Sequence, residues 1–212
     1  MSTHLVDRYL QAPQIYERHA ITIAAPADRV WAAVDTVEMG DVPVLKFLMS
    51  ARTAVGKVFG GREPATSSEP TMTLLTRSDT EVVYGFVGRW WSMGKDVDRD
   101  DIDTPDKFLA FAEPDYGKGT YSFRTELDDR GRIRLITETR VRTTDEKSYR
   151  SMNRYWLLIG PFSGLLRRLL LLEIRKQSCR WSRATGRRFR ENSDPLLVIS
   201  EFGRPNRCGD RT

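Results

Sequence analysis

The sequence contains few of the residues that stabilise disulfide-rich or metal-bound domains. Among its 212 residues are two cysteines, Cys179 and Cys208, and two histidines, His4 and His19. Two cysteines are too few for the disulfide framework of a small secreted domain, so we expect two free thiols. The histidines are far apart in the sequence and no cysteine lies near them, which does not fit a zinc site. We therefore expect no bound metal.

The sequence also lacks the short motifs of several large enzyme classes. It has no Gly-x-Ser-x-Gly motif, no glycine-rich phosphate loop and no dinucleotide-binding fingerprint. These absences disfavour the corresponding hydrolases and nucleotide-dependent enzymes, and we expect no cofactor.

No apolar run is long enough to cross a membrane. The longest apolar region, 156–174, is interrupted by Gly160-Pro161, Arg167-Arg168 and Glu173, whereas a membrane span needs about 20 mostly apolar residues. Residues 1–9 are polar and lack the apolar stretch of a signal peptide. We therefore expect a cytoplasmic protein.

Positive charge is concentrated at the C-terminal end. The formal net charge is +5, and residues 180–212 contain eight arginines and four acidic residues, which leaves the rest nearly neutral. Such a tail can contact anionic lipid, nucleic acid or an acidic partner, or it can be a solvated end. We expect no specific nucleic-acid partner and keep weak contact with anionic membranes as an alternative. The sequence leaves the oligomeric state open.

Alternation of apolar and polar residues predicts six strands. The last five follow one another with no helix between them, which favours an antiparallel meander. The predicted strands are Ile15–Ala24, Thr71–Arg77, Glu81–Trp91, Lys107–Glu113, Gly119–Leu127 and Arg132–Arg142.

Helical periodicity predicts two short helices after the first strand and one long helix after the last. The first begins at Ala25-Pro26 and ends at Gly40, and the second runs from Asp41 to about Arg52. The long helix extends from Asp145 to about Thr185, with a break or kink expected at Gly160-Pro161.

These elements predict an α+β helix-grip fold, in which a curved six-stranded antiparallel sheet wraps around the C-terminal helix. We expect an N-terminal extension (1–14), one domain (15–185) and a basic, disordered tail (186–212).

Four segments in this order resemble the START-like superfamily, which is also called the polyketide cyclase/dehydrase, SRPBCC or birch-allergen-like superfamily. They are Ala25–Trp31, Glu81–Trp91, Gly119–Val141 and Tyr155–Arg168. The resemblance implies the helix-grip fold and a hydrophobic, lipid-like or aromatic small molecule held inside it. The superfamily includes carriers, sensors and aromatase/cyclases, and this sequence is most similar to its uncharacterised bacterial members.

Alternate residues of a strand share a face, so three sets of strand residues are expected to line the interior together with residues of the long helix. This lining is mostly apolar with a few hydroxyls and suits a hydrophobic ligand, although the same residues could fill a solid core. The candidate ligand-binding residues are Tyr84, Phe86, Trp90, Tyr121, Phe123, Thr125, Thr137, Thr139, Tyr155 and Trp156.

Three functions follow from these observations. The first is a binding or carrier module for a hydrophobic small molecule. The second is a cyclase/dehydrase-like enzyme, which requires a buried carboxylate, tyrosine or arginine inside the pocket. The third is a peripheral membrane or interaction protein that binds through the arginine-rich tail.

Two charged features have alternative interpretations. Glu138 and Arg140 are expected to form an exposed charge network, with Glu138 as a proton carrier being the less favoured alternative. Residues 95–107 contain six aspartates, of which the first three have the spacing of a calcium loop. Asp101 and Lys107 occupy the positions that need glycine and glutamate, so we expect a solvated acidic loop at the mouth of the fold that could gate entry.

The leucines of 157–172 allow two interpretations. With the neighbouring arginines they could lie on a membrane surface. An apolar helical stripe is ordinarily buried, however, so we expect these leucines to pack against the sheet.

Overall fold

The computed structural model describes residues 4–37, 72–92 and 99–191, with side chains described as far as residue 180. Five strands form one antiparallel sheet in the order β1-β5-β4-β3-β2. Their bounds are Ile15–Ile23 (β1), Thr73–Arg77 (β2), Glu81–Gly88 (β3), Gly117–Leu127 (β4) and Ile133–Thr143 (β5). The predicted α+β class and antiparallel pairing are confirmed.

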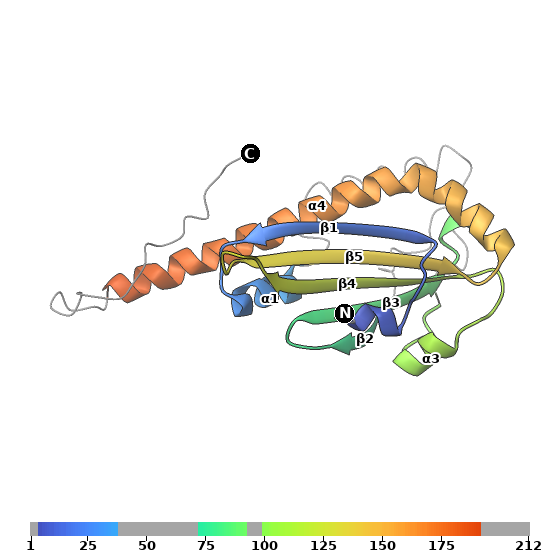
Figure 1. Cartoon of the computed structure of the whole chain (residues 1–212), viewed down its shortest axis with the longest axis horizontal. Coiled ribbons are helices and arrows are strands. Elements are labelled where there is room, and N and C mark those ends of the chain that lie inside the picture. Colours follow the sequence, from blue (N-terminus) through green and yellow to red (C-terminus); the bar gives the residue numbers. More distant parts are fainter. Residues whose placement is uncertain (1–3, 38–71, 93–98, 192–212) are drawn as a thin grey trace.

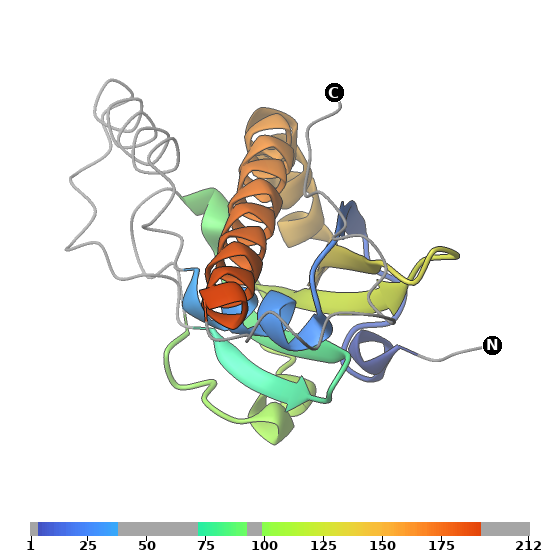
Figure 2. The ribbon, with the colours of Figure 1, turned by 90° about the vertical axis from the view of Figure 1, so that its left-hand side faces the viewer.

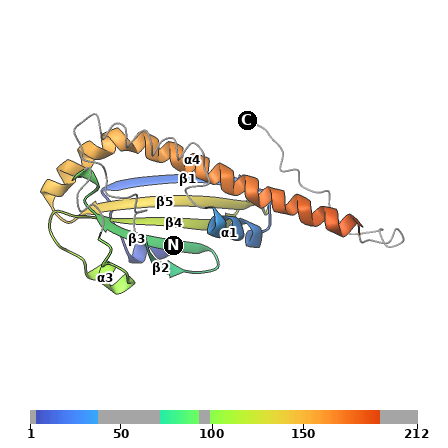
Figure 3. The same cartoon turned by 180° about the vertical axis from the view of Figure 1, so that it is seen from behind.

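Helical elements cover both faces of this sheet (Figures 1 and 3). The long C-terminal helix α4 (Glu146–Glu191) and the short helix α1 (Ala27–Thr36) share one hydrophobic core with the sheet. The 3₁₀ helix η1 (Leu5–Arg8) and helix α3 (Pro105–Ala110) pack on the opposite face. A second 3₁₀ helix, η3 (Trp90–Ser92), follows β3, so the end of the predicted strand Glu81–Trp91 is helical instead.

The prediction of a strand at Lys107–Glu113 is wrong, and the sheet therefore has five strands. This segment begins within α3, where the side chain of Thr104 caps the helix by accepting a hydrogen bond from the Lys107 N–H (3.3 Å). Pro105 occupies the first turn, where its missing N–H costs nothing. Phe108 is fully buried against the sheet. The threonine cap and the proline thus favour a helix over the short apolar alternation.

The structure also bears on the helices predicted after the first strand and on the C-terminal end. Between β1 and β2 the described residues contain one helix, α1, and the second predicted helix, Asp41–Arg52, lies outside them. At the other end, α4 continues to Glu191, so the first residues of the predicted tail are helical.

Cys179 is disulfide-bonded, which corrects the expectation of a free thiol there.

The N-terminal segment is an integral part of the fold. Val6 and Leu10 are buried. The backbone N–H groups of Leu5 and Val6 donate hydrogen bonds to the buried Glu81 carboxylate at 2.8 and 3.2 Å. Residues 4–10 therefore close the sheet face opposite α4.

The charge network around Glu138 lies on this same face. Glu138 is 4% exposed, so the expectation of an exposed network is wrong. Its carboxylate accepts hydrogen bonds from Arg140 and from the Tyr16 hydroxyl (3.1 Å), and Arg140 also donates to Asp7 (2.7 Å). The network joins the N-terminal segment to β5 and faces away from α4.

The sequence predicts a break or kink at Gly160-Pro161; helix α4 is continuous through Pro161, so there is no break. Figure 1 shows that the helix bends nearer its N-terminal end, as expected where proline removes a backbone hydrogen bond. At 46 residues it is about 70 Å long, whereas the longest strands, at 11 residues, are about 36 Å. The C-terminal part of α4 therefore extends past the sheet. No helix among the described residues is both long and apolar enough to span a membrane.

The leucines of α4 do not all pack into the core. Leu170 and Leu171 are buried with Ile174 against the sheet and α1. Leu157 is 77% exposed and Leu172 is 43% exposed. The expectation that the leucines of 157–172 pack against the sheet thus holds for only part of them.

Substitution of a buried leucine of α4 should therefore lower the stability of the protein far more than substitution of an exposed one. Replacing Leu171 by alanine is expected to lower the free energy of unfolding by about 2–5 kcal/mol, because it leaves a cavity in the core. Replacing Leu157 by alanine should change it by less than about 0.5 kcal/mol. Urea denaturation of both variants measures the difference, and equal effects would contradict this orientation of α4.

Asp145 caps the start of α4. The backbone N–H and the hydroxyl of Ser148 donate to its carboxylate at 2.9 and 2.7 Å, and the Asp115 N–H donates at 2.6 Å. These hydrogen bonds, first those from Ser148, lower the pKa of Asp145 to about 2.

Because this pKa is lower in the folded chain, the ionised cap stabilises the fold above the unfolded pKa of about 3.9. That contribution disappears as the pH falls toward 2. Replacing Asp145 by alanine should cost about 1 kcal/mol at neutral pH and progressively less below about pH 4. The exposed Asp129 provides the control, and unfolding curves across this pH range measure the loss; a cost independent of pH would refute the assignment.

Candidate functional site

A band of polar side chains crosses the interface between α4 and the sheet. Strand pairing aligns Glu17, Thr139, Tyr121 and Tyr84 in one row across β1, β5, β4 and β3. The next row contains His19, Thr137, Phe123 and Val82. We use the name polar band for Glu17, His19, Tyr121, Thr137, Thr139, Ser163 and Arg167.

The carboxylate of the polar band is that of Glu17 on β1, and its polar neighbours are His19, Ser163 and Arg167. Glu17 Oε1 lies 2.8 Å from His19 Nε2, and Glu17 Oε2 accepts a hydrogen bond from the Ser163 hydroxyl at 2.8 Å. The Glu17 and His19 side chains are each 15% exposed. Gly164 makes this approach possible, because a Cβ there would lie 2.8 Å from Glu17 Oε1. The histidine contacts the glutamate and not the serine, so this is no serine-nucleophile triad.

Arg167 provides the positive charge of the polar band from α4. Its side chain is 14% exposed, and Nε lies 3.5 Å from Glu17 Oε2. Its guanidinium carbon lies 4.7 Å from the centre of the Tyr121 ring, a cation–π contact. Its Nη1 is 3.4 Å from Thr137 Oγ1, a long hydrogen bond. Arg167 is thus held by a ring and weak polar contacts.

Two buried atoms of the polar band have no hydrogen-bond partner among the described residues. They are Arg167 Nε and Thr139 Oγ1. Arg167 Nε is close enough to Glu17 for an ion pair but does not meet hydrogen-bond geometry, so its N–H is unsatisfied. A buried polar group without a partner costs about 1–3 kcal/mol. Both groups therefore have hydrogen-bonding capacity that no described residue uses.

Tyr121 adds a neutral hydroxyl to the same row. Burial raises the pKa of its phenol, and the charge of Arg167 and a hydrogen bond with Thr137 offset part of this effect. The group is therefore protonated at neutral pH and can donate a hydrogen bond. No described strand or helix places a second carboxylate in the band beside Glu17.

The interface is apolar on both sides of the polar band. One side is the aliphatic core, where Ile23, Leu135, Leu170, Leu171 and Ile174 are buried. The other side is an aromatic cluster of Phe86, Trp90, Trp91, Tyr155 and Trp156 around Ile15, Val141 and Met152.

Glycines in β4 accommodate these aromatic rings. The Phe86 and Trp90 rings are 5.1 Å apart in an edge-to-face arrangement. A Cβ at Gly119 would lie 2.3 Å from the Phe86 ring, and one at Gly117 would lie 2.7 Å from the Trp90 ring. The two rings therefore occupy the space that side chains at these positions would need.

The predicted ligand-binding residues divide among these three regions. Register and packing bring Tyr121, Thr137 and Thr139 into the polar band, with Tyr84 beside Tyr121. Phe123 packs in the aliphatic core, and the buried Thr125 lies on the same face beside Leu135. The aromatic cluster contains the remaining four: Phe86, Trp90, Tyr155 and Trp156.

The sequence-based prediction missed Glu17, His19, Ser163 and Arg167. A signal for the strand residues was present, because Glu17 and His19 interrupt an otherwise apolar face of β1 between Ile15 and Ile23. Residues 163 and 167 are one helical turn apart, so they share a face of α4. These observations do not show that the strand and helix residues meet.

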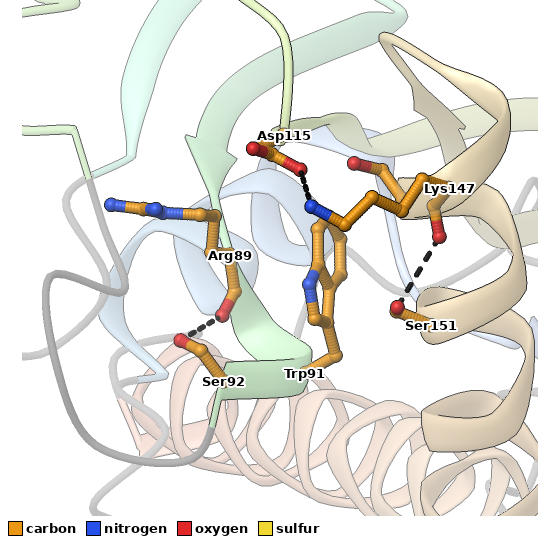
Figure 4. A pocket seen from close by; sticks show the side chains of 7 residues that line it. Arg89, Trp91, Ser92, Asp115, Lys147 and Ser151 are labelled. Atoms are coloured by element: carbon orange, nitrogen blue, oxygen red, sulfur yellow. Dashed lines mark hydrogen bonds and ion pairs between the residues drawn. The ribbon is translucent and has the colours of Figure 1, made fainter.

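A separate hollow of about 210 Å³ lies at the start of α4 (Figure 4). Figure 4 shows Lys147 reaching toward Asp115 across this hollow, and the two form an ion pair at 3.1 Å. Trp91 lines it and also belongs to the aromatic cluster. The full lining is Arg89, Trp91, Ser92, Asp115, Lys147, Ser148 and Ser151. The hollow therefore borders the aromatic end of the interface.

The described part of the acidic loop lies on the other side of the sheet. Ile102 is buried with Phe108 on the face away from α4, and Arg99 forms ion pairs with Asp101 and Glu113. The expected position at the mouth of the grip is wrong for this part. Among the described residues no group of three histidines, cysteines or acids could hold a metal ion, and Asp96 and Asp98 lie outside them.

The Glu17–Arg167 pair should be energetically coupled. A double-mutant cycle with Glu17→Gln and Arg167→Gln is expected to give a coupling free energy of about 1–3 kcal/mol, because the charges are largely shielded from water. The exposed pair Glu146–Arg150 on α4 is the control, with about 0.3–0.5 kcal/mol. Unfolding free energies measure both cycles, and equal coupling would show that the band gains nothing from burial.

Comparison with known proteins gives few matches. No family model matches the sequence, and no curated protein matches it. A hypothetical protein from Helicobacter pylori aligns with a TM-score of 0.39 and 9% identity, over 84% of this chain and 96% of that chain. The Zhui aromatase/cyclase from a Streptomyces species aligns with 0.31 and 15%, over 81% and 98%. A protein from Thermus thermophilus aligns with 0.34 and 11%, over 79% and 99%. All three TM-scores are below 0.5, so neither family nor function follows from them.

Proposed function

We propose that this chain is a START-like, helix-grip binding or carrier module for an apolar small molecule that carries an oxygen-containing polar group. The molecule lies between α4 and the sheet. The observation that supports this most directly is the polar band, with its unsatisfied Arg167 Nε and Thr139 Oγ1.

The energetics favour a binding role for the band. A charged pair buried in an interface costs several kcal/mol of desolvation unless geometry and hydrogen bonds are good. The polar contacts of Arg167 with described residues are long, at 3.4 Å to Thr137 and 3.5 Å to Glu17. An aliphatic residue at this position would extend the adjacent core formed by Leu170 and Leu171. A ligand oxygen would supply the missing hydrogen bonds and offset this cost.

The arrangement suggests an orientation for the ligand. Its polar group accepts hydrogen bonds from Arg167, Thr139 and Tyr121, and its apolar part lies against the aromatic cluster. Trp91 belongs to the aromatic cluster and also lines the hollow of Figure 4. We therefore propose that the ligand enters through this hollow, at the start of α4. The lipid-like or aromatic character of the ligand and a cytoplasmic location remain part of this proposal.

Adjacent arginines of α4 provide a matched test. Arg167 is largely buried and Arg168 is exposed. Titration calorimetry with 2-naphthoate and 2-methylnaphthalene compares an aromatic probe with and without a carboxylate. We expect 2-naphthoate to bind and Arg167→Leu to weaken it about tenfold or more, given the strength of charged hydrogen bonds, while Arg168→Leu leaves it unchanged.

Native mass spectrometry of the full chain purified from cells checks for a bound small molecule independently. A chain that is always empty and binds neither probe would rule out the carrier function. If Arg167→Leu and Arg168→Leu change the affinity for 2-naphthoate equally, the polar band does not bind the carboxylate.

A cyclase/dehydrase-like enzyme is the second candidate, and one observation favours it. The interface contains a carboxylate, a tyrosine and an arginine, Glu17, Tyr121 and Arg167, which are the groups that an enzyme of this type needs in its pocket. Incubation with a linear poly-β-keto thioester should then yield a product lighter by one water, because an intramolecular aldol bond forms a ring and the resulting hydroxyl leaves with a neighbouring hydrogen as water. Glu17→Gln should abolish that product while 2-naphthoate still binds. Absence of any dehydrated product in the unmodified protein counts against the enzyme.

A further inference from the structure

Helix α4 has a second apolar face that does not contact the sheet. Five large side chains on it are between 43% and 77% exposed. We call them the outer stripe: Leu157, Leu158, Phe162, Leu165 and Leu172. From Leu158 onward they recur at helical spacing, so they form one continuous surface rather than scattered exposed residues.

The outer stripe is distinct from the face of α4 that holds the fold together. The sheet-facing side is formed by Met152, Ser163, Arg167, Leu171 and Ile174, which contact the strands or are buried with them. Figure 2 shows α4 at the surface of the molecule with the sheet to one side of it. The core therefore does not account for the outer stripe.

Positive charge surrounds this stripe. By sequence, α4 contains twelve basic residues and three acidic residues. Arg150 and Arg154 precede the stripe, Arg168 lies within it and Arg175 follows it, all exposed. The acid nearest to it in the helix, Glu173, is paired with Lys176 at 3.1 Å.

We propose that the outer stripe is a docking surface for an anionic lipid bilayer, with α4 lying along the membrane plane. Leucine and phenylalanine side chains enter the boundary between headgroups and acyl chains, and the arginines contact lipid phosphates. The helix lies on the bilayer rather than crossing it, in keeping with the absence of a spanning helix among the described residues. This surface is independent of the small-molecule site, which uses the opposite face of α4.

Charge favours a lipid surface over a second copy of the chain. A two-fold symmetric contact through the outer stripe would bring Arg154, Arg168 and Arg175 of one copy toward the same residues of the other. Like charges placed together disfavour such a contact. An anionic bilayer instead supplies the opposite charge along the whole stripe.

Vesicle flotation with the full chain tests the proposal. Vesicles of phosphatidylcholine with one quarter phosphatidylglycerol should bind the protein, pure phosphatidylcholine should bind it weakly, and added salt should release it. The double variant Leu157→Ser/Phe162→Ser should reduce binding about tenfold or more, because two large apolar groups no longer enter the bilayer. The control Leu109→Ser/Leu127→Ser removes leucines that are 49% and 72% exposed on α3 and β4, and should bind as the unmodified protein does.

Further measurements separate the alternatives. Binding of 2-naphthoate should be the same in the double variant and the unmodified protein, which keeps this result independent of the proposed carrier function. The proposal is overturned if anionic vesicles do not bind, or if both double variants lose binding equally. If only the double variant Arg187→Gln/Arg188→Gln loses vesicle binding, the membrane contact is made by the basic C-terminal residues and the proposal for the outer stripe is overturned. A dimer that the Leu157→Ser/Phe162→Ser variant dissociates without lipid, measured by ultracentrifugation, would assign the stripe to a second copy.

Discussion

The contact of α4 with β1 and β5 is the interaction on which the rest of the structure depends. The apolar side chains of α4 at Leu170, Leu171 and Ile174 join those of α1 and the sheet in one core. Since hydrophobic burial is the dominant favourable term in folding, this end of α4 determines where the helix lies. The polar band lies on the same face, two turns earlier in the helix, so its position follows from that core.

The polar band and the aliphatic core make opposite contributions to stability. The core gains free energy from burial, whereas the band requires the partial desolvation of Glu17 and Arg167. The neighbouring aromatic cluster adds further apolar contact on the other side. The polar band is thus enclosed between two apolar regions of the same interface.

Helix α4 has apolar side chains on two faces, and only one of these faces is buried against the sheet. Along 157–172, leucines occur on both sides of the helix, but the sheet covers only one. On the opposite face of the sheet, η1 is held through Glu81 and the network of Arg140, Glu138 and Asp7. Helix α3 packs on the same face through Phe108. Both sheet faces are thus covered, and the outer stripe remains the large exposed apolar surface of α4.

The sequence by itself determined all five strands, the class, the short helix α1 and the long helix α4, because alternation and helical periodicity are local patterns. It also showed correctly that Tyr84, Tyr121 and Thr139 share one face of the sheet. It did not reveal α3, where the cap at Thr104 competes with a short apolar alternation. The tertiary structure alone brought Glu17 to Ser163, which are 146 positions apart. That meeting depends on strand register and on the rotation of α4 about its axis, and neither is encoded in any local pattern.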